Sequence, residues 1–251
     1  MKSLLSTIGA VTRESGVSVP ALLVPPRIRG EEILDRGNVD PSVITRSIGD
    51  VARANALFGG VSAVLAEIES AAPSLPRSAS MLDIGTGTGD IPRAAMKKLA
   101  ARGIRLSTFG LDRVEALAAA SRDNVTAAIR GDALRVPFAD HSVDIVLCSQ
   151  LLHHCLPDDA IALIREMNRV ARARVIISDI RRSWVAAAGL WIASFPLRFH
   201  PIARHDGVVS VMRGFTAAEL GELISRALGV EVRAARRFGF RVTASWAPVK
   251  S

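Results

Sequence analysis

The chain has 251 residues, of which 49% are hydrophobic and 22% are charged. These proportions exclude a disordered chain and suit one α/β domain, with or without a small appendage. The net charge is +8, but the arginines are spread along the whole chain instead of forming patches, so nucleic acid is not the expected partner.

The first part of the chain divides into two segments. Residues 1–40 are punctuated by prolines and glycines, and they predict a flexible N-terminal arm. Helical spacing of apolar residues begins at Pro41 and is interrupted only at Gly59-Gly60. This spacing predicts a helical N-terminal cap over residues 41–75.

From residue 76 onward, strand and helix patterns alternate. Apolar runs rich in β-branched residues predict strands at 80–85, 106–112, 125–133, 143–150 and 174–180. Helices are predicted at 90–103, 114–123, 157–172 and 215–229, and two paired strands at 230–240 and 241–248. The pattern predicts an α/β fold, with a parallel sheet covered by helices on both faces.

Residues 81–90 read MLDIGTGTGD, a glycine-rich turn directly after a strand. A dinucleotide site would read G-x-G-x-x-G, and a Walker loop would carry Gly-Lys-Ser/Thr; neither pattern is present. Asp83 at the strand end would repel a pyrophosphate but attract an ammonium group. S-adenosylmethionine (SAM) carries an ammonium group and no phosphate, so the turn favours SAM as the ligand.

The following strands supply further contacts for the same ligand. Asp112 ends the second strand, where a carboxylate can bind ribose hydroxyls, and Asp132 follows the third, near the expected adenine. The fourth strand, VDIVLCSQLLHH, ends below the expected sulfonium. The complete set of predicted cofactor contacts is Asp83, Gly85, Thr86, Gly87, Gly89, Asp90, Asp112, Arg113, Asp132, Ala133, Ser149 and Gln150.

The segments MLDIGTGTGD, GLD, GDALRVPF, VDIVLCSQLLHH and LIREMNRVARARVIISDI resemble, in order and spacing, the motifs of class I SAM-dependent methyltransferases. Within that class the chain is similar to the bacterial small-molecule branch of ubiquinone/menaquinone-type and secondary-metabolite enzymes. RSIGDVARANALFGG and DIRRSW resemble a subgroup associated with polyketide pathways. The resemblance implies a Rossmann-like, mostly parallel seven-stranded sheet with an antiparallel C-terminal strand and an N-terminal helical lid. It assigns residues 76–251 to the methyltransferase domain.

Three histidines are candidates for catalysis. His153 and His154 directly follow the fourth strand, and we expect one of them, His154, to face the ligand. His205 lies beside Asp206 in a predicted loop, and a neighbouring carboxylate can orient an imidazole. Each of the three has the alternative interpretation of a structural, hydrogen-bonded or solvated side chain.

In related methyltransferases an insertion like the one at about 181–214 helps to form the substrate cavity, so the resemblance implies an apolar cavity built from it and the N-terminal helices. The insertion contains a short apolar helix and several arginines that could meet an acidic acceptor. The substrate contacts predicted here are Arg181, Arg182, Trp191 and Arg213.

The sequence predicts a methyltransferase for a small hydrophobic hydroxylated acceptor (aromatic, quinone or polyketide-like), most simply at oxygen. The alternatives are carbon methylation as in quinone biosynthesis, RNA methylation, and a SAM-binding module without turnover. CSQLLHH lacks the Asn/Asp-Pro-Pro-aromatic motif of nucleic-acid amino-methylating enzymes.

Cys148 and Cys155 fit neither metal spacing nor a disulfide framework, and no metal is expected. We recognise neither a signal peptide nor a membrane span, and expect a cytoplasmic monomer or homodimer.

Overall fold

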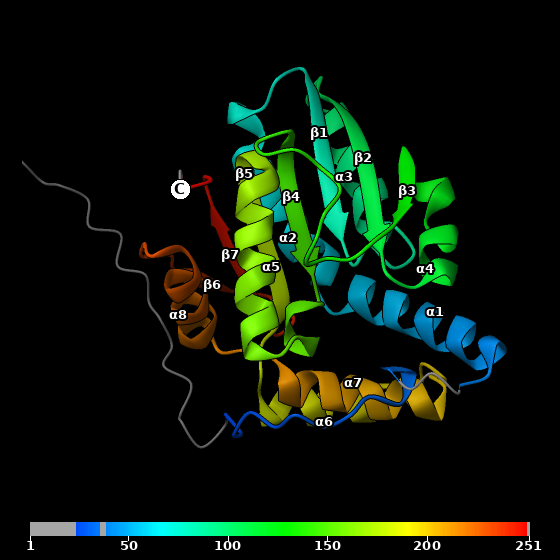
Figure 1. Cartoon of the computed structure of the whole chain (residues 1–251). Helices are drawn as coiled ribbons and strands as arrows, with labels where there is room; N and C mark the ends of the chain where they lie inside the picture. The colour runs from blue at the N-terminus through cyan, green and yellow to red at the C-terminus, as the bar shows by residue number, and fades with distance from the viewer. Residues whose placement is uncertain (1–23, 36–38, 250–251) are drawn as a thin grey trace, which may run out of the picture.

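The predicted strands assemble into one sheet in the computed structural model, which describes residues 24–35 and 39–249 (Figure 1). The sheet has seven strands in the order β3-β2-β1-β4-β5-β7-β6. Strands β1 to β5 run parallel, and β7 is antiparallel to both of its neighbours. The bounds are β1 Ser78–Ile84, β2 Arg105–Asp112, β3 Ala127–Arg130, β4 Val143–Ser149, β5 Ala171–Ile180, β6 Ala234–Arg237 and β7 Arg241–Trp246. The predicted fold class is confirmed.

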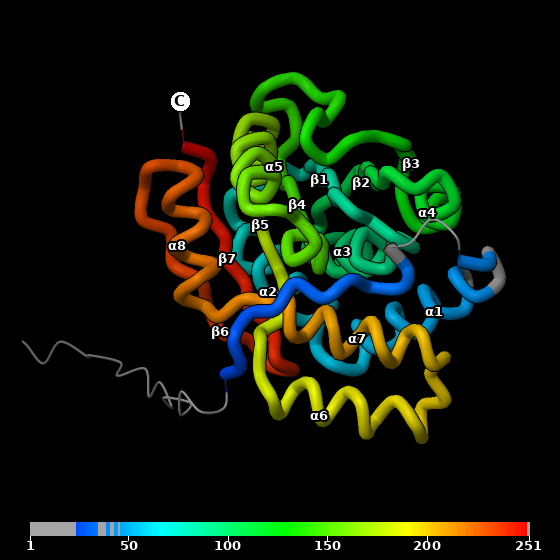
Figure 2. The backbone as a smooth tube through the Cα atoms, turned by 60° about the horizontal axis from the view of Figure 1, so that its bottom comes forward, coloured from blue at the N-terminus to red at the C-terminus, as the bar shows by residue number. Residues whose placement is uncertain are grey.

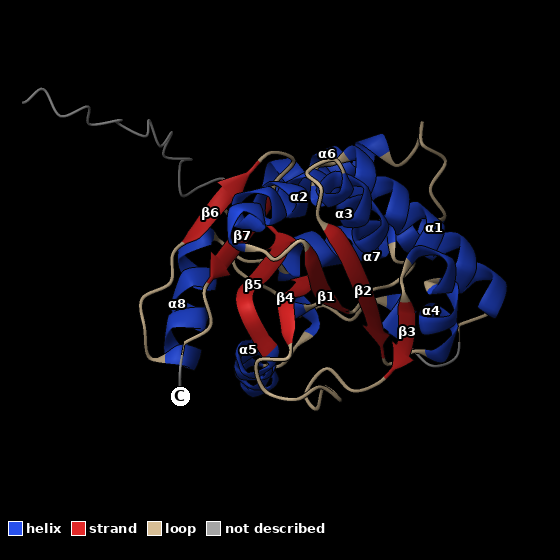
Figure 3. Cartoon of the chain, turned by 90° about the horizontal axis from the view of Figure 1, so that it is seen from above, coloured by secondary structure: helices blue, strands red, loops and turns tan. Residues whose placement is uncertain are grey.

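Helices cover both faces of this sheet (Figure 3). On one face α2 (Gly60–Ala71) and α3 (Asp90–Ala100) pack on a cluster that includes Met81 and Ile145. On the other face α5 (Pro157–Val170) and α8 (Ala217–Leu228) pack on a cluster that includes Val146. The central strand β4 is buried along all but its last residue, which explains why its sequence is continuously apolar instead of alternating.

The strand order reverses between β1 and β4. These two strands start crossovers in opposite directions, β1 toward β2 and β4 toward β5, and they pair directly, with Ile84 opposite Cys148. In open α/β sheets ligands bind outside the carboxyl ends of the strands at such a reversal. The glycine turn after β1 and the residues after β4 therefore meet at one place.

Three helices lie across the carboxyl ends of the strands: α1 (Pro41–Leu57), α6 (Trp184–Ala193) and α7 (Pro201–Arg213) (Figure 1). In a second view α6 is the outermost of them, with α7 between α6 and the sheet (Figure 2). The short helix α4 (Glu115–Ala120) lies beside β2 and β3. The three crossing helices enclose the space in which an acceptor would sit.

The predicted N-terminal cap divides into two helices with different roles. Only α1 crosses the strand ends, as a lid would. Val64 and Ile68 of α2 are fully buried in the same cluster as Ile176 of β5, so α2 belongs to the core of the sheet domain. The predicted N-terminal helices are present: α1 lies over the strand ends, whereas α2 packs in the core.

The described part of the predicted flexible arm, residues 24–35, is packed against the domain. The Arg182 guanidinium donates to the Pro25 carbonyl oxygen at 2.8 Å. The Asp206 carboxylate accepts hydrogen bonds from the backbone N–H groups of Ile33 and Leu34 at 2.8 and 2.9 Å. The arm prediction is corrected for this stretch because its backbone groups find partners in α7 and next to α6; residues 1–23 and 36–38 lie outside the described residues.

The insertion at 181–214 contains two helices, α6 and α7, instead of one apolar helix and a loop. Strands β3 and β6 are shorter than predicted, four residues each. Within residues 24–35 and 39–249, no single helix is long and apolar enough to cross a membrane. The bent pair Arg46–Leu57 and Gly60–Ser74, at 56°, passes that test by length and composition only.

Candidate active site

The glycine turn after β1 has the backbone conformation that its sequence demands. Gly85, Gly87 and Gly89 all have positive φ angles, 75°, 54° and 77°. A Cβ on Gly87 would meet nothing within 4 Å, so the space above the turn is open to a ligand. A Cβ on Gly89 would lie 2.9 Å from the Cβ of Asn124, so this position needs glycine for packing as well.

Asp83, at the end of β1, is a buried carboxylate with unused hydrogen-bonding capacity. Its side chain is almost fully buried, and its Oδ1 has no hydrogen-bond partner within the described part of the chain. Burial, together with the negative charge of Asp112, raises its pKa to about 7. The buried hydroxyl oxygens of Thr86 and Ser149 also lack partners among the described residues. A cationic donor such as the ammonium group of SAM fits this unsatisfied acceptor.

Asp112 and Asp132 each keep acceptor capacity beyond their internal hydrogen bonds. The Asp112 carboxylate accepts from the backbone N–H groups of Gly87 at 3.3 Å and Val114 at 2.9 Å, and burial raises its pKa. Asp132 is exposed, and its Oδ1 accepts from the backbone of Leu134 at 2.9 Å. Both oxygens of a carboxylate have two lone pairs, so ribose and adenine donors remain compatible with these positions.

The other predicted cofactor contacts lie at the same edge of the sheet. Asp90 is the first residue of α3, at the positive end of the helix dipole. Arg113 is exposed directly after β2, and Ala133 is half-buried after Asp132. Gln150, after β4, has a positive φ of 55° and also lines the neighbouring cavity. Gln150 is therefore the point where the predicted cofactor site and the cavity meet.

A cavity of about 620 Å³ lies next to Gln150 under the crossing helices. Its walls come from residues 32–34, α1, α6, α7 and the turn between β6 and β7. They are mainly apolar and include Leu57, Phe58, Val185, Leu190, Phe199 and Phe240. Its volume is in the range of small-molecule sites, and the polar residues Gln150, His153, His154 and Arg181 line it beyond the ends of β4 and β5.

The buried pair His153–Asp179 is the best-organised polar group in this cavity. Nδ1 of His153 lies 2.6 Å from Oδ1 of Asp179, and both side chains are almost completely buried. Burial by itself would raise the pKa of Asp179, but the charge of His153 and its hydrogen bond hold that pKa below its ordinary value. Because an ionised carboxylate can only accept, Nδ1 of His153 carries the proton in this hydrogen bond, which selects the Nδ1–H tautomer whenever the imidazole is neutral. Nε2 then carries a lone pair, and it has no hydrogen-bond partner among the described residues.

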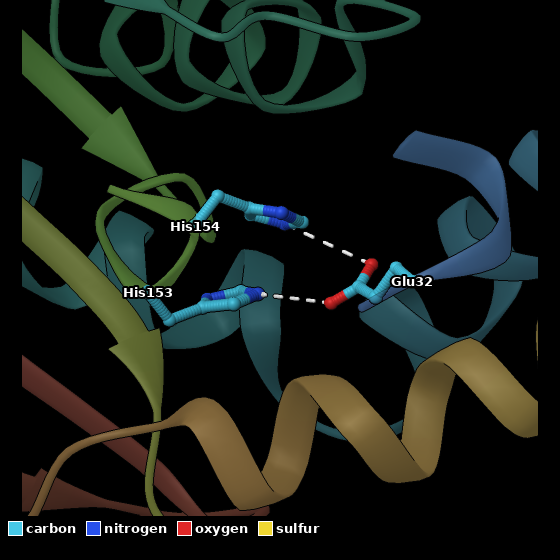
Figure 4. Close-up of side chains that lie close together, drawn as sticks. All are labelled: Glu32, His153 and His154. Atoms are coloured by element: carbon cyan, nitrogen blue, oxygen red, sulfur yellow. Dashed lines mark ion pairs between the residues drawn. The ribbon is translucent and has the colours of Figure 1, made fainter. Parts of the chain in front are cut away.

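Glu32 and His154 complete a cluster around that nitrogen (Figure 4). Nε2 of His153 lies 3.9 Å from one Glu32 oxygen, and Nε2 of His154 lies 3.9 Å from the other. Three ligand atoms of this cluster lie within 4.8 Å of one another, as a metal site would require. Glu32, however, already accepts from Ser210 at 2.7 Å and lies 3.3 Å from the Arg213 guanidinium. Because that guanidinium neutralises the carboxylate, we interpret the cluster as a binding and proton-transfer group.

Two arginines make the same end of the cavity electropositive. Arg241 is buried, donates to Gln150 Oε1 at 2.7 Å, and has its pKa lowered to about 10 by burial. Arg181 lines the cavity, stacks on the Phe240 ring at 4.9 Å, and has its pKa lowered by burial. Among the described residues no hydrogen-bond partner exists for its Nε atom. Both side chains can stabilise an anionic acceptor oxygen.

The structure changes the ranking of the three histidines. Both His153 and His154 line the cavity, so the expected division into one ligand-facing and one helix-facing residue is wrong. His205 lies in α7, not in a loop, its side chain is 51% exposed, and it lies outside the described cavity lining. Its neighbour Asp206 is buried, and its carboxylate is occupied with the backbone of residues 33–34, so it ties that segment to α7.

Three of the predicted substrate contacts lie outside the described cavity lining. Arg182 is buried and binds Pro25, Gly214 and Glu219, so its guanidinium is fully engaged in structure. Trp191 is half exposed on the outer side of α6, against Phe195. Arg213 contacts Glu32 instead of lining the described cavity. Of the four predicted substrate contacts, Arg181 is the one that lines the described cavity.

Sequence reasoning missed two members of the site, Glu32 and Asp179. Glu32 lies in the stretch predicted to be a loose arm, where no local pattern marks it. Asp179 stands near the end of the strand that pairs with β4, so strand adjacency would have placed it beside the histidines that follow β4.

Comparisons with known proteins agree with this architecture. Residues 82–177 match the family described as a methyltransferase domain. A demethylmenaquinone methyltransferase from Roseiflexus sp. (strain RS-1) is 35% identical over 129 residues, which is 49% of this chain and 51% of that protein. The match thus spans about half the length of the curated relative.

Solved structures share the fold over most of the chain. A SAM-dependent methyltransferase from Aquifex aeolicus superposes with a TM-score of 0.58 at 17% identity, over 84% of this chain and 100% of that one. A magnesium protoporphyrin IX methyltransferase from Synechocystis PCC 6803 with bound SAM superposes with a TM-score of 0.52 at 14% identity. The match covers 86% of this chain and 88% of that one. Residues 82–177 thus match a methyltransferase domain, and the chain shares the fold of these SAM-dependent methyltransferases.

Proposed function

We propose that the protein transfers a methyl group from SAM to a hydroxyl oxygen of a small hydrophobic acceptor of the aromatic, quinone or polyketide type. The observation that carries this proposal is the position of the apolar cavity. It is lined by Gln150, which follows β4, the strand paired with β1, and by His153, which is held by the buried Asp179. Apolar walls select a hydrophobic acceptor, and the polar group around His153 fixes where its hydroxyl lies.

The residues of the turn fit the donor. Asp83 supplies the unsatisfied carboxylate for the ammonium group, and Asp112 and Asp132 supply acceptors for ribose and adenine. When bound, SAM supplies an electrophilic methyl group on a sulfonium and becomes a neutral thioether after the transfer. The glycine backbone at Gly87 leaves room for the ligand to approach the chain.

The residues of the cavity would act mainly by positioning. Holding the two reactants close and in line can contribute about 7–11 kcal/mol to lowering the barrier. We assign His153 the role of accepting the hydroxyl proton at Nε2, because Asp179 fixes its tautomer and its orientation. Asp179 stabilises the resulting imidazolium, and Arg181 and Arg241 favour the anionic oxygen that attacks. The proton then leaves to solvent after product release.

Carbon methylation of a quinone precursor is the second candidate. The Roseiflexus relative is named as a demethylmenaquinone methyltransferase, which favours such an acceptor. A hydroquinone carbon becomes nucleophilic when the neighbouring hydroxyl is deprotonated, so the same cavity groups would serve. The two candidates differ in whether the new bond is C–O or C–C; in the second, the methylated ring carbon then loses its own proton and the ring oxygen regains one, which restores the aromatic hydroquinone.

A turnover screen tests the proposal. The protein would be incubated with SAM and a panel of phenolic, hydroquinone and polyketide acceptors, and products would be analysed by mass spectrometry. Fragmentation distinguishes an O-methyl ether from a C-methyl product. Tight SAM binding without turnover on any member of the panel would support a non-catalytic binding module instead.

Variants of the buried pair test the assigned base. His153→Ala and Asp179→Asn should lower kcat by about 10²–10³-fold, because each removes general-base catalysis. The dissociation constant for SAM, measured by calorimetry, should change less than about twofold, since neither residue belongs to the turn. His205→Ala is the matched control, because it also removes a histidine hydrogen-bonded to an aspartate. Equal losses of kcat in all three variants would contradict the assignment.

A further inference from the structure

Helix α6 exposes an unusually large set of apolar side chains. Four side chains of α6 and Phe195, just after its end, are between 47% and 62% exposed; the four are Trp184, Val185, Trp191 and Ile192. Their spacing of one, seven, eight and eleven residues after Trp184 places them along one stripe of the helical segment. The opposite side of α6, which includes Ala186 and Ala187, packs on α7. We call the exposed stripe the outer face of α6; Figure 2 shows α6 as the outermost helix there.

Two arginines lie beside this face. Residues 183–205 contain Arg198 and Arg204, with two histidines and no aspartate or glutamate. Arg198 is exposed just after α6, and the Arg204 guanidinium lies 3.7 Å from the centre of the Phe195 ring. An apolar stripe with cationic neighbours is complementary to a surface that offers hydrocarbon together with negative charge.

The outer face adjoins the mouth of the acceptor cavity. Val51, Leu57, Val185 and Phe238 all line the cavity and are nevertheless between 44% and 84% exposed, so they form its opening. Val185 belongs to both this opening and the outer face of α6. A hydrophobic molecule that partitions near the outer face would therefore meet the cavity without crossing water.

We propose that the outer face of α6 docks the protein on the surface of an anionic lipid bilayer, from which a lipophilic acceptor enters the cavity beside Val185. A ten-residue helix is about 15 Å long, half the thickness of the hydrocarbon core, so α6 would lie flat at the interface. Its two tryptophans suit the interfacial region, where an indole ring places its apolar body in lipid and its N–H in water.

A second copy of the chain is a poorer occupant of this face. A two-fold dimer would place the same patch on both subunits, and the arginines around one α6 would then face those around the other. A bilayer with anionic headgroups matches the same arginines. The inference rests on the proposed function only for the route of the acceptor, since docking itself needs neither donor nor acceptor.

Vesicle flotation with the full chain tests the docking. The protein is mixed with vesicles of phosphatidylglycerol and phosphatidylcholine in equal parts, or of phosphatidylcholine alone, without SAM or acceptor. We expect binding to the anionic vesicles that weakens as salt is added. The variant Trp184→Ser with Ile192→Ser should bind about tenfold more weakly, because it removes two exposed side chains that line neither the cavity nor the turn.

The matched control is Leu156→Ser with Val230→Ser, which removes two exposed apolar side chains away from α6. This control should bind vesicles like the wild type, and SAM binding by both double variants should show that they fold. Absence of wild-type binding at low salt, or equal binding by both double variants, overturns the proposal. A wild-type dimer in sedimentation that becomes a monomer in the α6 variant, without vesicle binding, overturns it in favour of a second copy.

Discussion

At the scale of single residues, Asp83 controls how donor binding depends on pH. Its pKa is 3.8 in an ordinary environment and about 7 in the folded protein, because burial disfavours the charged form. Between these values the folded state holds more protons than the unfolded one, so this residue makes stability fall as pH rises from about 4 to about 7. SAM affinity should rise with pH through about 7, where Asp83 ionises, and fall above about 8, where the α-amino group loses its proton. Calorimetric titrations across this range measure both limbs.

Two substitutions isolate this effect. Asp83→Asn should weaken SAM binding by about 10–100-fold at pH 7.5 and abolish the rising limb, because the amide cannot ionise. Asp132→Asn should weaken binding but keep the rising limb, since it removes a different predicted contact. A rising limb that persists in Asp83→Asn would assign the titration to another group.

At the scale of elements, residues 24–35 bring Glu32 and Leu34 into the cavity, and Arg182 holds this segment in place. The Arg182 guanidinium is 4% exposed and binds the Pro25 carbonyl, the Gly214 carbonyl and both Glu219 oxygens. Arg182→Ala should lower the free energy of unfolding by about 2–4 kcal/mol, because it leaves buried carbonyls without donors. Acceptor KM should rise more than the SAM dissociation constant, because the segment borders the cavity and not the glycine turn. The exposed Arg198→Ala serves as control, with an expected change below about 0.5 kcal/mol in denaturant titrations.

At the scale of the whole molecule, the donor site and the acceptor cavity share one sheet, so ligand binding should stabilise the described domain as a unit. The helix α2, although it precedes the glycine turn in sequence, is buried against β1, β4 and β5. Donor at 100 times its dissociation constant should add about 2.7 kcal/mol, which corresponds to a rise in Tm of about 5–10 °C. Differential scanning calorimetry should show one transition that shifts as a whole. Two separate transitions, only one of which responds to SAM, would contradict this unity.

The sequence by itself determined the elements that depend on local chemistry. The strands, the glycine turn and the carboxylates at the strand ends could be predicted because each is encoded in a few consecutive residues: apolar runs form strands, and left-handed turns need glycine. Even the ligand class followed from Asp83 beside that turn. The order of the strands could not be worked out from such patterns, and the family resemblance implied only a mostly parallel seven-stranded sheet with an antiparallel C-terminal strand.

The tertiary structure alone decided which side chains form the acceptor end of the cavity. His153 and Asp179 meet because β4 and β5 are neighbours, and Glu32 joins them from a segment more than a hundred residues earlier in the chain. The same packing placed Arg182 in the interior and Trp191 on the surface, although the sequence predicted that both contact the substrate. A side chain's role there depends on which distant backbone packs beside it, and no local pattern records that contact.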